Sequence, residues 1–222
     1  DKVRRTPYDE VLTAERRETK AVLEIIDPII LNENKSEPVI FADLHTFSSN
    51  KGLFVICPRT EVNESVLNKL NVPLIFGIEK ALHGTALKYV SNAGNIGFAF
   101  EAGKHFSKNA EFNATAGLYK LLSSSGCLAS KFIPDFDEYE SFLEEQIQGL
   151  PPKVEFVYKH IIEKEDEFEM RPGFQNFDKV KKGDWLANDK LGKIEAQADG
   201  YILMPLYQEK GEDGFFIVKE LE

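Results

Sequence analysis

The sequence contains few cysteines. Cys57 and Cys127 stand far apart, and neither belongs to a Cys-x-x-Cys motif. A disulfide framework or a cysteine metal site needs more cysteines at closer spacing. We therefore expect two reduced, buried thiols in a cytoplasmic protein.

Long apolar runs and clusters of basic residues are also missing. No run approaches the roughly 20 apolar residues of a membrane-spanning helix, and no signal peptide is visible. The 27 Lys and Arg residues are outnumbered by 37 Asp and Glu residues, which gives a net charge of −10. Arg4-Arg5 and Arg16-Arg17 are interrupted by acids, whereas phosphate contacts need clustered cations. We predict neither a nucleic-acid nor a membrane partner, and the sequence leaves homo-oligomerisation open.

Apolar runs alternate with helical patterns over residues 1–150. Thr6-Pro7 followed by acids predicts a helix start, and Asp27-Pro28 predicts its end. Runs with the character of buried strands cover 39–42, 53–57, 74–76 and 96–100, and helices are expected at 64–70 and 110–122. Strands that alternate with helices are typical of an α/β sheet domain.

The pattern changes after Pro151-Pro152. Short strand-like stretches separated by glycine turns follow, namely 154–162, 180, 185–187, 194, 201–204 and 215–218. This pattern favours a small all-β domain over residues 151–222.

His45 and Glu101 each follow a predicted strand, in Asp43-Leu44-His45 and Phe100-Glu101-Ala102-Gly103. Catalytic groups of α/β sheets gather at strand ends. Asp43 could orient a metal-binding imidazole, and a partly buried carboxylate can serve as a general base. From the pattern alone, a surface histidine and a charge that marks a strand end remain open.

The other histidines are weaker candidates. His160 and Glu163 have His-x-x-Glu spacing, but the flanking residues alternate as in a strand, so the two side chains point to opposite sides. His83 and His105 are expected in loops, where either could line a pocket.

The motifs resemble the succinylglutamate desuccinylase/aspartoacylase family, relatives of the zinc carboxypeptidases. The resemblance rests on 43–45, 94–103, 168–177, 182–187, 200–207 and 213–216, and it extends over essentially the whole chain. It implies a zinc-carboxypeptidase-like α/β domain, N-terminally incomplete, followed by the small all-β domain.

The resemblance also implies an activity, namely zinc-dependent hydrolysis of the amide of an N-acylated acidic amino acid such as N-succinylglutamate or N-acetylaspartate. It makes His45 one Zn²⁺ ligand and Glu101 the base that activates a zinc-bound water. Tyr207 would bind the substrate from the β-domain, and Arg59 is a weaker candidate for its carboxylate.

Some family features are absent. The His-x-x-Glu motif that supplies two zinc ligands does not occur at the expected place, so the comparison implies a portion missing ahead of Asp1. We therefore expect this chain to be inactive by itself.

Three other functions compete with this interpretation. A non-catalytic small-molecule binding protein could use the same scaffold without metal. A biotinyl or lipoyl carrier is disfavoured because the hairpin tip, 197–200, has no lysine. A carboxypeptidase acting on peptides is disfavoured because the β-domain would narrow the cleft.

Overall fold

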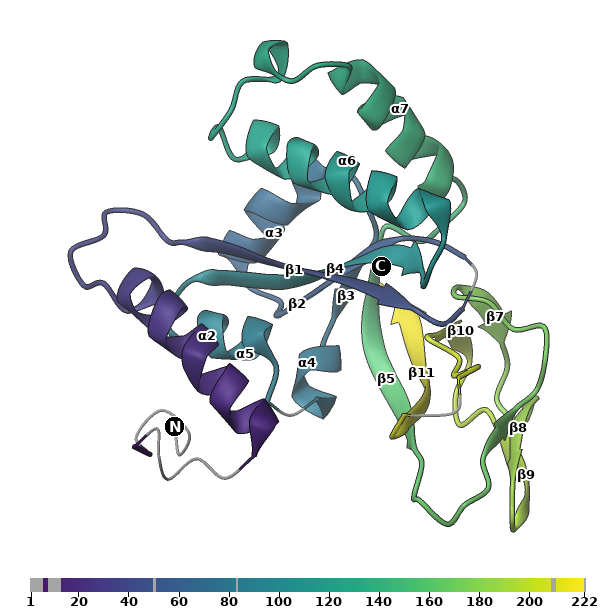
Figure 1. Cartoon of the computed structure of the whole chain (residues 1–222). Coiled ribbons are helices and arrows are strands. Elements are labelled where there is room, and N and C mark those ends of the chain that lie inside the picture. The colour runs from purple at the N-terminus through teal and green to yellow at the C-terminus, as the bar shows by residue number, and fades with distance from the viewer. Residues whose placement is uncertain (1–5, 8–12, 50, 83, 209–210, 222) are drawn as a thin grey trace.

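The structure, a computed structural model, describes residues 6–7, 13–49, 51–82, 84–208 and 211–221. Element labels follow Figure 1. The helices are α2 (Ala14–Ile30), α3 (Glu61–Leu67), η2 (Asn68–Leu70), α4 (Ile78–Ala81), α5 (Ala86–Asn92), α6 (Lys108–Ser124), η3 (Ser130–Phe132) and α7 (Phe136–Ile147). The strands are β1 (Ile40–Phe47), β2 (Phe54–Cys57), β3 (Leu74–Phe76), β4 (Ile96–Lys104), β5 (Lys153–Ile161), β6 (Glu169–Met170), β7 (Asp178–Val180), β8 (Trp185–Asp189), β9 (Gly192–Glu195), β10 (Gly200–Leu203) and β11 (Asp213–Glu220).

Eight strands form one mixed sheet in the order β1-β4-β2-β3-β5-β11-β10-β7. Parallel pairs join β1 to β4, β2 to β3 and β3 to β5, and the remaining neighbours are antiparallel. A second antiparallel sheet has the order β6-β8-β9. These two sheets with their helices confirm the predicted fold class, an α/β sheet with a small β-region.

Helices cover both faces of the large sheet (Figure 1). One core packs α3, α6 and α7 against β2, β3 and β4, through residues such as Leu67, Ala116 and Leu143. The other core places α4 and α5 on the opposite face, where Ile78 and Leu87 contact the sheet. The sheet is therefore buried on both sides, which explains why its strands read as continuous apolar runs.

The strands beyond residue 150 extend this sheet. β5 pairs in parallel with β3, and its other edge pairs with β11. A third core, centred on Leu186, Ile202 and Phe215, fills the space between the two sheets. The division at 150/151 stays a prediction, and the backbone hydrogen bonds show that strands on both sides of it share one sheet.

Helix α2 differs from its predicted bounds. Thr13 caps it by accepting a hydrogen bond from the Arg16 amide, so α2 begins at Ala14 and not at Thr6-Pro7 as predicted. The first turns of the predicted helix, 8–12, lie outside the described residues. The helix also continues through Pro28 to Ile30. Proline removes one amide donor, but the Leu31 amide still donates to the Asp27 carbonyl oxygen at 3.0 Å, so the last turn persists.

The two cysteines occupy different environments. Cys57 is buried in β2 as predicted, whereas Cys127 is exposed. Cys127 follows the turn at Gly126, where the chain leaves α6, so the prediction of a second buried thiol was wrong. Among the described helices, none has the length and apolar character to cross a membrane.

Gly117 sets how closely α6 approaches β4. A Cβ atom at this position would lie 2.6 Å from the Phe100 ring, and both residues are buried. Overpacking costs about 1–3 kcal/mol, while alanine gains up to about 1 kcal/mol within a helix. We expect Gly117→Ala to lower the free energy of unfolding by about 1 kcal/mol in urea denaturation. The loss should shrink in a Phe100→Leu background, and equal losses in both backgrounds would contradict this contact.

Candidate active site

Strands β1 and β4 bring His45 and Glu101 together. The two residues are register partners in the parallel pair. Side chains alternate along a strand, so Asp43, His45 and Glu101 lie on the face that also buries Phe47 and Ala99. Both strands are longer than predicted, and these residues lie within strands rather than after them. The reason is that the ladder between β1 and β4 continues through the polar positions.

Glu101 is an almost completely buried carboxylate. Its exposed fraction is 7%, and its Oε2 atom has no hydrogen-bond partner among the described residues. Burial raises the pKa of Glu101 from 4.5 to about 7, His45 opposes this rise and Asp43 adds to it. A carboxyl group with a pKa near neutrality can both accept and release a proton during a reaction.

His45 is held by the carboxylate that the sequence suggested. Its Nε2 atom lies 3.0 Å from Oδ1 of Asp43. This hydrogen bond raises the pKa of His45, although partial burial acts in the opposite direction. A carboxylate on one ring nitrogen fixes the orientation of an imidazole and leaves the other nitrogen available, the usual arrangement of a metal-binding histidine.

A cavity of about 440 Å³ opens beside Glu101. Its lining comes from the end of β1, from β2, from the end of β4, from the segment before α5, from the connection between β10 and β11, and from β11. The ionisable groups in this lining are Glu101, Glu212, Asp213 and His105. Lys159 forms an ion pair with Asp213 at 2.6 Å. Polar and apolar walls are contributed by Thr46, Phe47, Ser48, Ile56, Leu82, Met204, Leu206, Gln208, Gly211 and Phe216.

The described residues fit only part of a zinc site. His45 has the chemistry and orientation of one ligand, and Glu101 that of an adjacent base. No group of three or more His, Cys, Asp or Glu residues suited to a metal ion occurs in the described ranges. Any complete three-ligand site therefore needs groups beyond these residues.

The other predicted site residues, Tyr207 and Arg59, are not among the residues that line the Glu101 cavity. The Tyr207 hydroxyl lies 3.0 Å and 3.1 Å from the carbonyl oxygens of Arg171 and Phe174, while its backbone amide approaches Ser48 Oγ at 3.4 Å. Arg59 donates to Glu64 at 3.2 Å. It follows the carboxyl end of β2, which is antiparallel to β4. Arg59 therefore lies near the amino end of β4, whereas Glu101 lies toward its carboxyl end. Substrate binding by Tyr207 or by Arg59 stays a prediction.

The remaining histidines follow their predicted settings where they are described. His160 lies in β5, stacked against Phe215 and Phe168 with ring centroids 5.2 Å and 5.4 Å apart. This packing agrees with its assignment to a strand. His105 follows β4 and lines the Glu101 cavity, whereas His83 lies outside the described residues.

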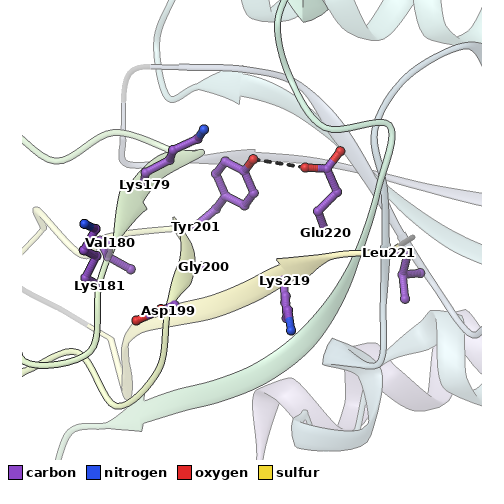
Figure 2. A pocket seen from close by; sticks show the side chains of 9 residues that line it. All are labelled: Lys179, Val180, Lys181, Asp199, Gly200, Tyr201, Lys219, Glu220 and Leu221. Atoms are coloured by element: carbon purple, nitrogen blue, oxygen red, sulfur yellow. Dashed lines mark hydrogen bonds between the residues drawn. The ribbon is translucent and has the colours of Figure 1, made fainter.

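A second cavity, of about 550 Å³, lies on the strands of the β-region (Figure 2). It includes Lys179 in β7, Lys181 directly after β7, Asp199 at the predicted hairpin tip, and Tyr201, whose hydroxyl donates to Glu220 at 3.2 Å. Asp199 accepts a hydrogen bond from the Lys182 amide. These residues come from strands remote from Glu101 in the sheet order, so this cavity is separate from the candidate active site.

Comparison with solved structures shows which class of fold this chain has. Solved structures similar to this chain include succinylglutamate desuccinylase and aspartoacylase family proteins, which confirms the predicted resemblance at the level of the fold. No family model and no curated protein sequence matches the chain.

Particular neighbours show the extent of the likeness. Succinylglutamate desuccinylase from Vibrio parahaemolyticus has a TM-score of 0.64 and 15% identity, over 96% of this chain and 63% of its own. The succinylglutamate desuccinylase/aspartoacylase from Rhodobacter sphaeroides gives 0.63 and 12%, over 91% and 63%. An aspartoacylase family protein from Mesorhizobium loti gives 0.56 and 14%, over 95% and 64%. This chain therefore spans less than two thirds of the length of these neighbours.

Several cavity residues went unrecognised in the sequence. Thr46 directly follows His45 and Ser48 comes two residues later, and a search of the residues around a candidate ligand could have found them. Gln208 and Asp213 gave no comparable signal. They reach the cavity because β11 returns antiparallel to β5, an arrangement that depends on long-range pairing.

Proposed function

We propose that this chain carries the base and one metal ligand of a zinc-dependent amidohydrolase acting on N-acyl amino acids. The observation that carries the proposal is the buried Glu101 carboxylate, with an unpartnered oxygen, beside His45 at a cavity. The likeness in fold to desuccinylase and aspartoacylase structures supports the same reaction class. The finer proposal is an N-acylated acidic amino acid, of the N-succinylglutamate or N-acetylaspartate type.

His45 and Glu101 have separate roles in this proposal. His45 would hold Zn²⁺ through the ring nitrogen that does not face Asp43. Zinc, when bound, supplies an activated water and polarises the amide carbonyl. Glu101 takes the proton of the attacking water, keeps it in its water-poor environment, and gives it to the nitrogen of the leaving amine. A pKa near 7 suits both transfers, because neither the acid nor the carboxylate is strongly preferred.

A non-catalytic binding protein remains the second candidate. It is favoured by one observation, the lack of a complete metal cluster in the described part of the chain. Stoichiometric zinc in the purified protein would support the enzyme, and consistent absence of zinc would support the binding protein. A small-molecule ligand and a cytoplasmic location are part of both proposals.

The proposed reaction predicts a zinc-dependent release of free amino acid. Protein that contains these residues would be incubated with N-acetylaspartate, N-succinylglutamate and, as a comparison substrate whose side chain is uncharged, N-acetylglutamine. We expect amine release from the acidic substrates, loss of release with a chelator, and recovery on adding zinc. Release that persists under chelation would contradict the zinc step. Preference for N-acetylglutamine would contradict the proposal of an acidic amino acid, and no release from the zinc-loaded protein would contradict hydrolysis.

A further inference from the structure

His105 directly follows the last residue of β4, and a backbone hydrogen bond fixes its position. Its backbone amide donates to the Phe47 carbonyl oxygen at 2.8 Å, which ties the turn after β4 to the end of β1. The register of the two strands shifts between His45 and Phe47, and Gly103 in this segment has a φ of 114°. Such irregularities next to a site redirect side chains, and here both Glu101 and His105 line the same cavity.

Thr46 holds the imidazole of His105. Its Oγ1 atom lies 2.6 Å from Nδ1 of His105. When the threonine hydroxyl donates to Nδ1, the proton of the neutral ring resides on Nε2. Among the described residues, no further hydrogen bond to this ring is found, so this cavity-lining side chain keeps an N–H donor for a ligand.

The remaining charges in the cavity lining make this donor distinctive. Among the ionisable residues of the described lining, Glu101, Glu212 and Asp213 are acids, and His105 is the one that carries an imidazole ring. Every N-acyl amino acid carries an α-carboxylate, and a buried carboxylate requires hydrogen-bond donors. An imidazole N–H beside the base could bind this group while the amide faces Glu101.

We propose that His105, oriented by Thr46, donates a hydrogen bond from Nε2 to the α-carboxylate of the substrate. His105 is then a substrate-binding residue and Thr46 a positioning residue. This inference rests on the proposed function, and it specifies which group of the substrate His105 recognises, namely the α-carboxylate.

The first test measures binding without catalysis. Metal-free protein would be titrated with N-acetylaspartate by calorimetry, because chelation stops the proposed reaction. We expect His105→Leu to raise Kd about 10-fold or more, since a hydrogen bond to a charged group contributes about 1.5–3 kcal/mol. His105→Gln retains an N–H donor and should stay within about 3-fold of the parent. Binding unchanged in His105→Leu, or no binding to the parent, would overturn the proposal.

The second test reads the positioning role of Thr46. Nitrogen-15 spectra of labelled histidine should show the Nε2–H form of His105 in the parent, and Thr46→Val should populate the Nδ1–H form. Thr115→Val is the matched control, because Thr115 lies on α6 and its hydroxyl bonds the Glu111 carbonyl oxygen. An unchanged tautomer in Thr46→Val would refute the positioning role.

Hydrolysis is assayed separately from binding. Weaker binding in His105→Leu without any hydrolysis by the parent would keep this inference and refute the proposed function. Hydrolysis with an unchanged KM in His105→Leu would refute the inference and keep the proposed function.

Discussion

Glu101→Gln is expected to stabilise the metal-free chain above neutral pH. Burial raises the pKa of Glu101 from 4.5 to about 7. Below the lower value both folded and unfolded chains hold the proton, and the group contributes nothing to the pH dependence. Between the two values the unfolded chain releases the proton while the folded chain retains it, so stability falls as pH rises. Above the upper value the loss is complete.

The pKa difference sets the size of this effect. Each unit corresponds to about 1.4 kcal/mol, so the parent chain loses about 3 kcal/mol between about pH 4 and pH 8 from this group. Glutamine has no titrating proton and a similar shape, although its amide meets the same shortage of partners. The difference in unfolding free energy between the variant and the parent should therefore grow with pH by about this amount.

Urea denaturation with a chelator at several pH values measures the difference. Glu155→Gln is the matched control, because Glu155 is an exposed strand residue in β5 and should give a change near zero. If the unfolding free energies of Glu101→Gln and of the parent change with pH in the same way, the Glu101 carboxyl group does not retain a proton in the folded chain, and the assignment is contradicted.

His45→Ala is expected to remove zinc binding. His45 has one ring nitrogen occupied by Asp43 at 3.0 Å and is half exposed, so the other nitrogen is accessible. Loss of a direct ligand should weaken zinc affinity more than the 10–100-fold that is typical of losing an outer partner, so we expect at least about 100-fold. Asp43→Asn should have the smaller, outer-partner effect, about 10-fold or more.

Equilibrium dialysis followed by elemental analysis tests this order of effects. His160→Gln is a useful control, because His160 lies in β5 and packs between aromatic rings. The same zinc content in His45→Ala and the parent would contradict the ligand assignment. A larger loss in Asp43→Asn than in His45→Ala would make Asp43 the direct ligand instead.

The sequence predicted the strands well because most are buried on both faces. Residues 53–57, 74–76 and 96–100 appear as short apolar runs, and the structure has strands at each. Their ends were less predictable, since Asp43 and Glu101 are polar residues kept in the strands by backbone pairing. The predicted helix end at Asp27-Pro28 was also wrong, because α2 tolerates the loss of one amide donor in its last turn.

The candidate site was predictable only in part. His45 and Glu101 stood out because each follows an apolar run, but neither local pattern shows that they are register partners. Their alignment depends on β1 pairing in parallel with β4 across a long stretch of chain. Likewise, His105 could be described as a loop histidine, while its contact with Thr46 arises from the bulged end of that ladder.

The role of Glu101 as a base is tested most directly by the hydrolysis rate of a zinc-loaded protein containing these residues, measured with N-acetylaspartate for the parent and Glu101→Gln. We expect kcat to fall by about 100- to 10,000-fold in the variant, with zinc content unchanged, because a positioned base contributes about 10²–10⁴-fold. Equal rates for the two proteins would contradict the assignment of Glu101 as the base.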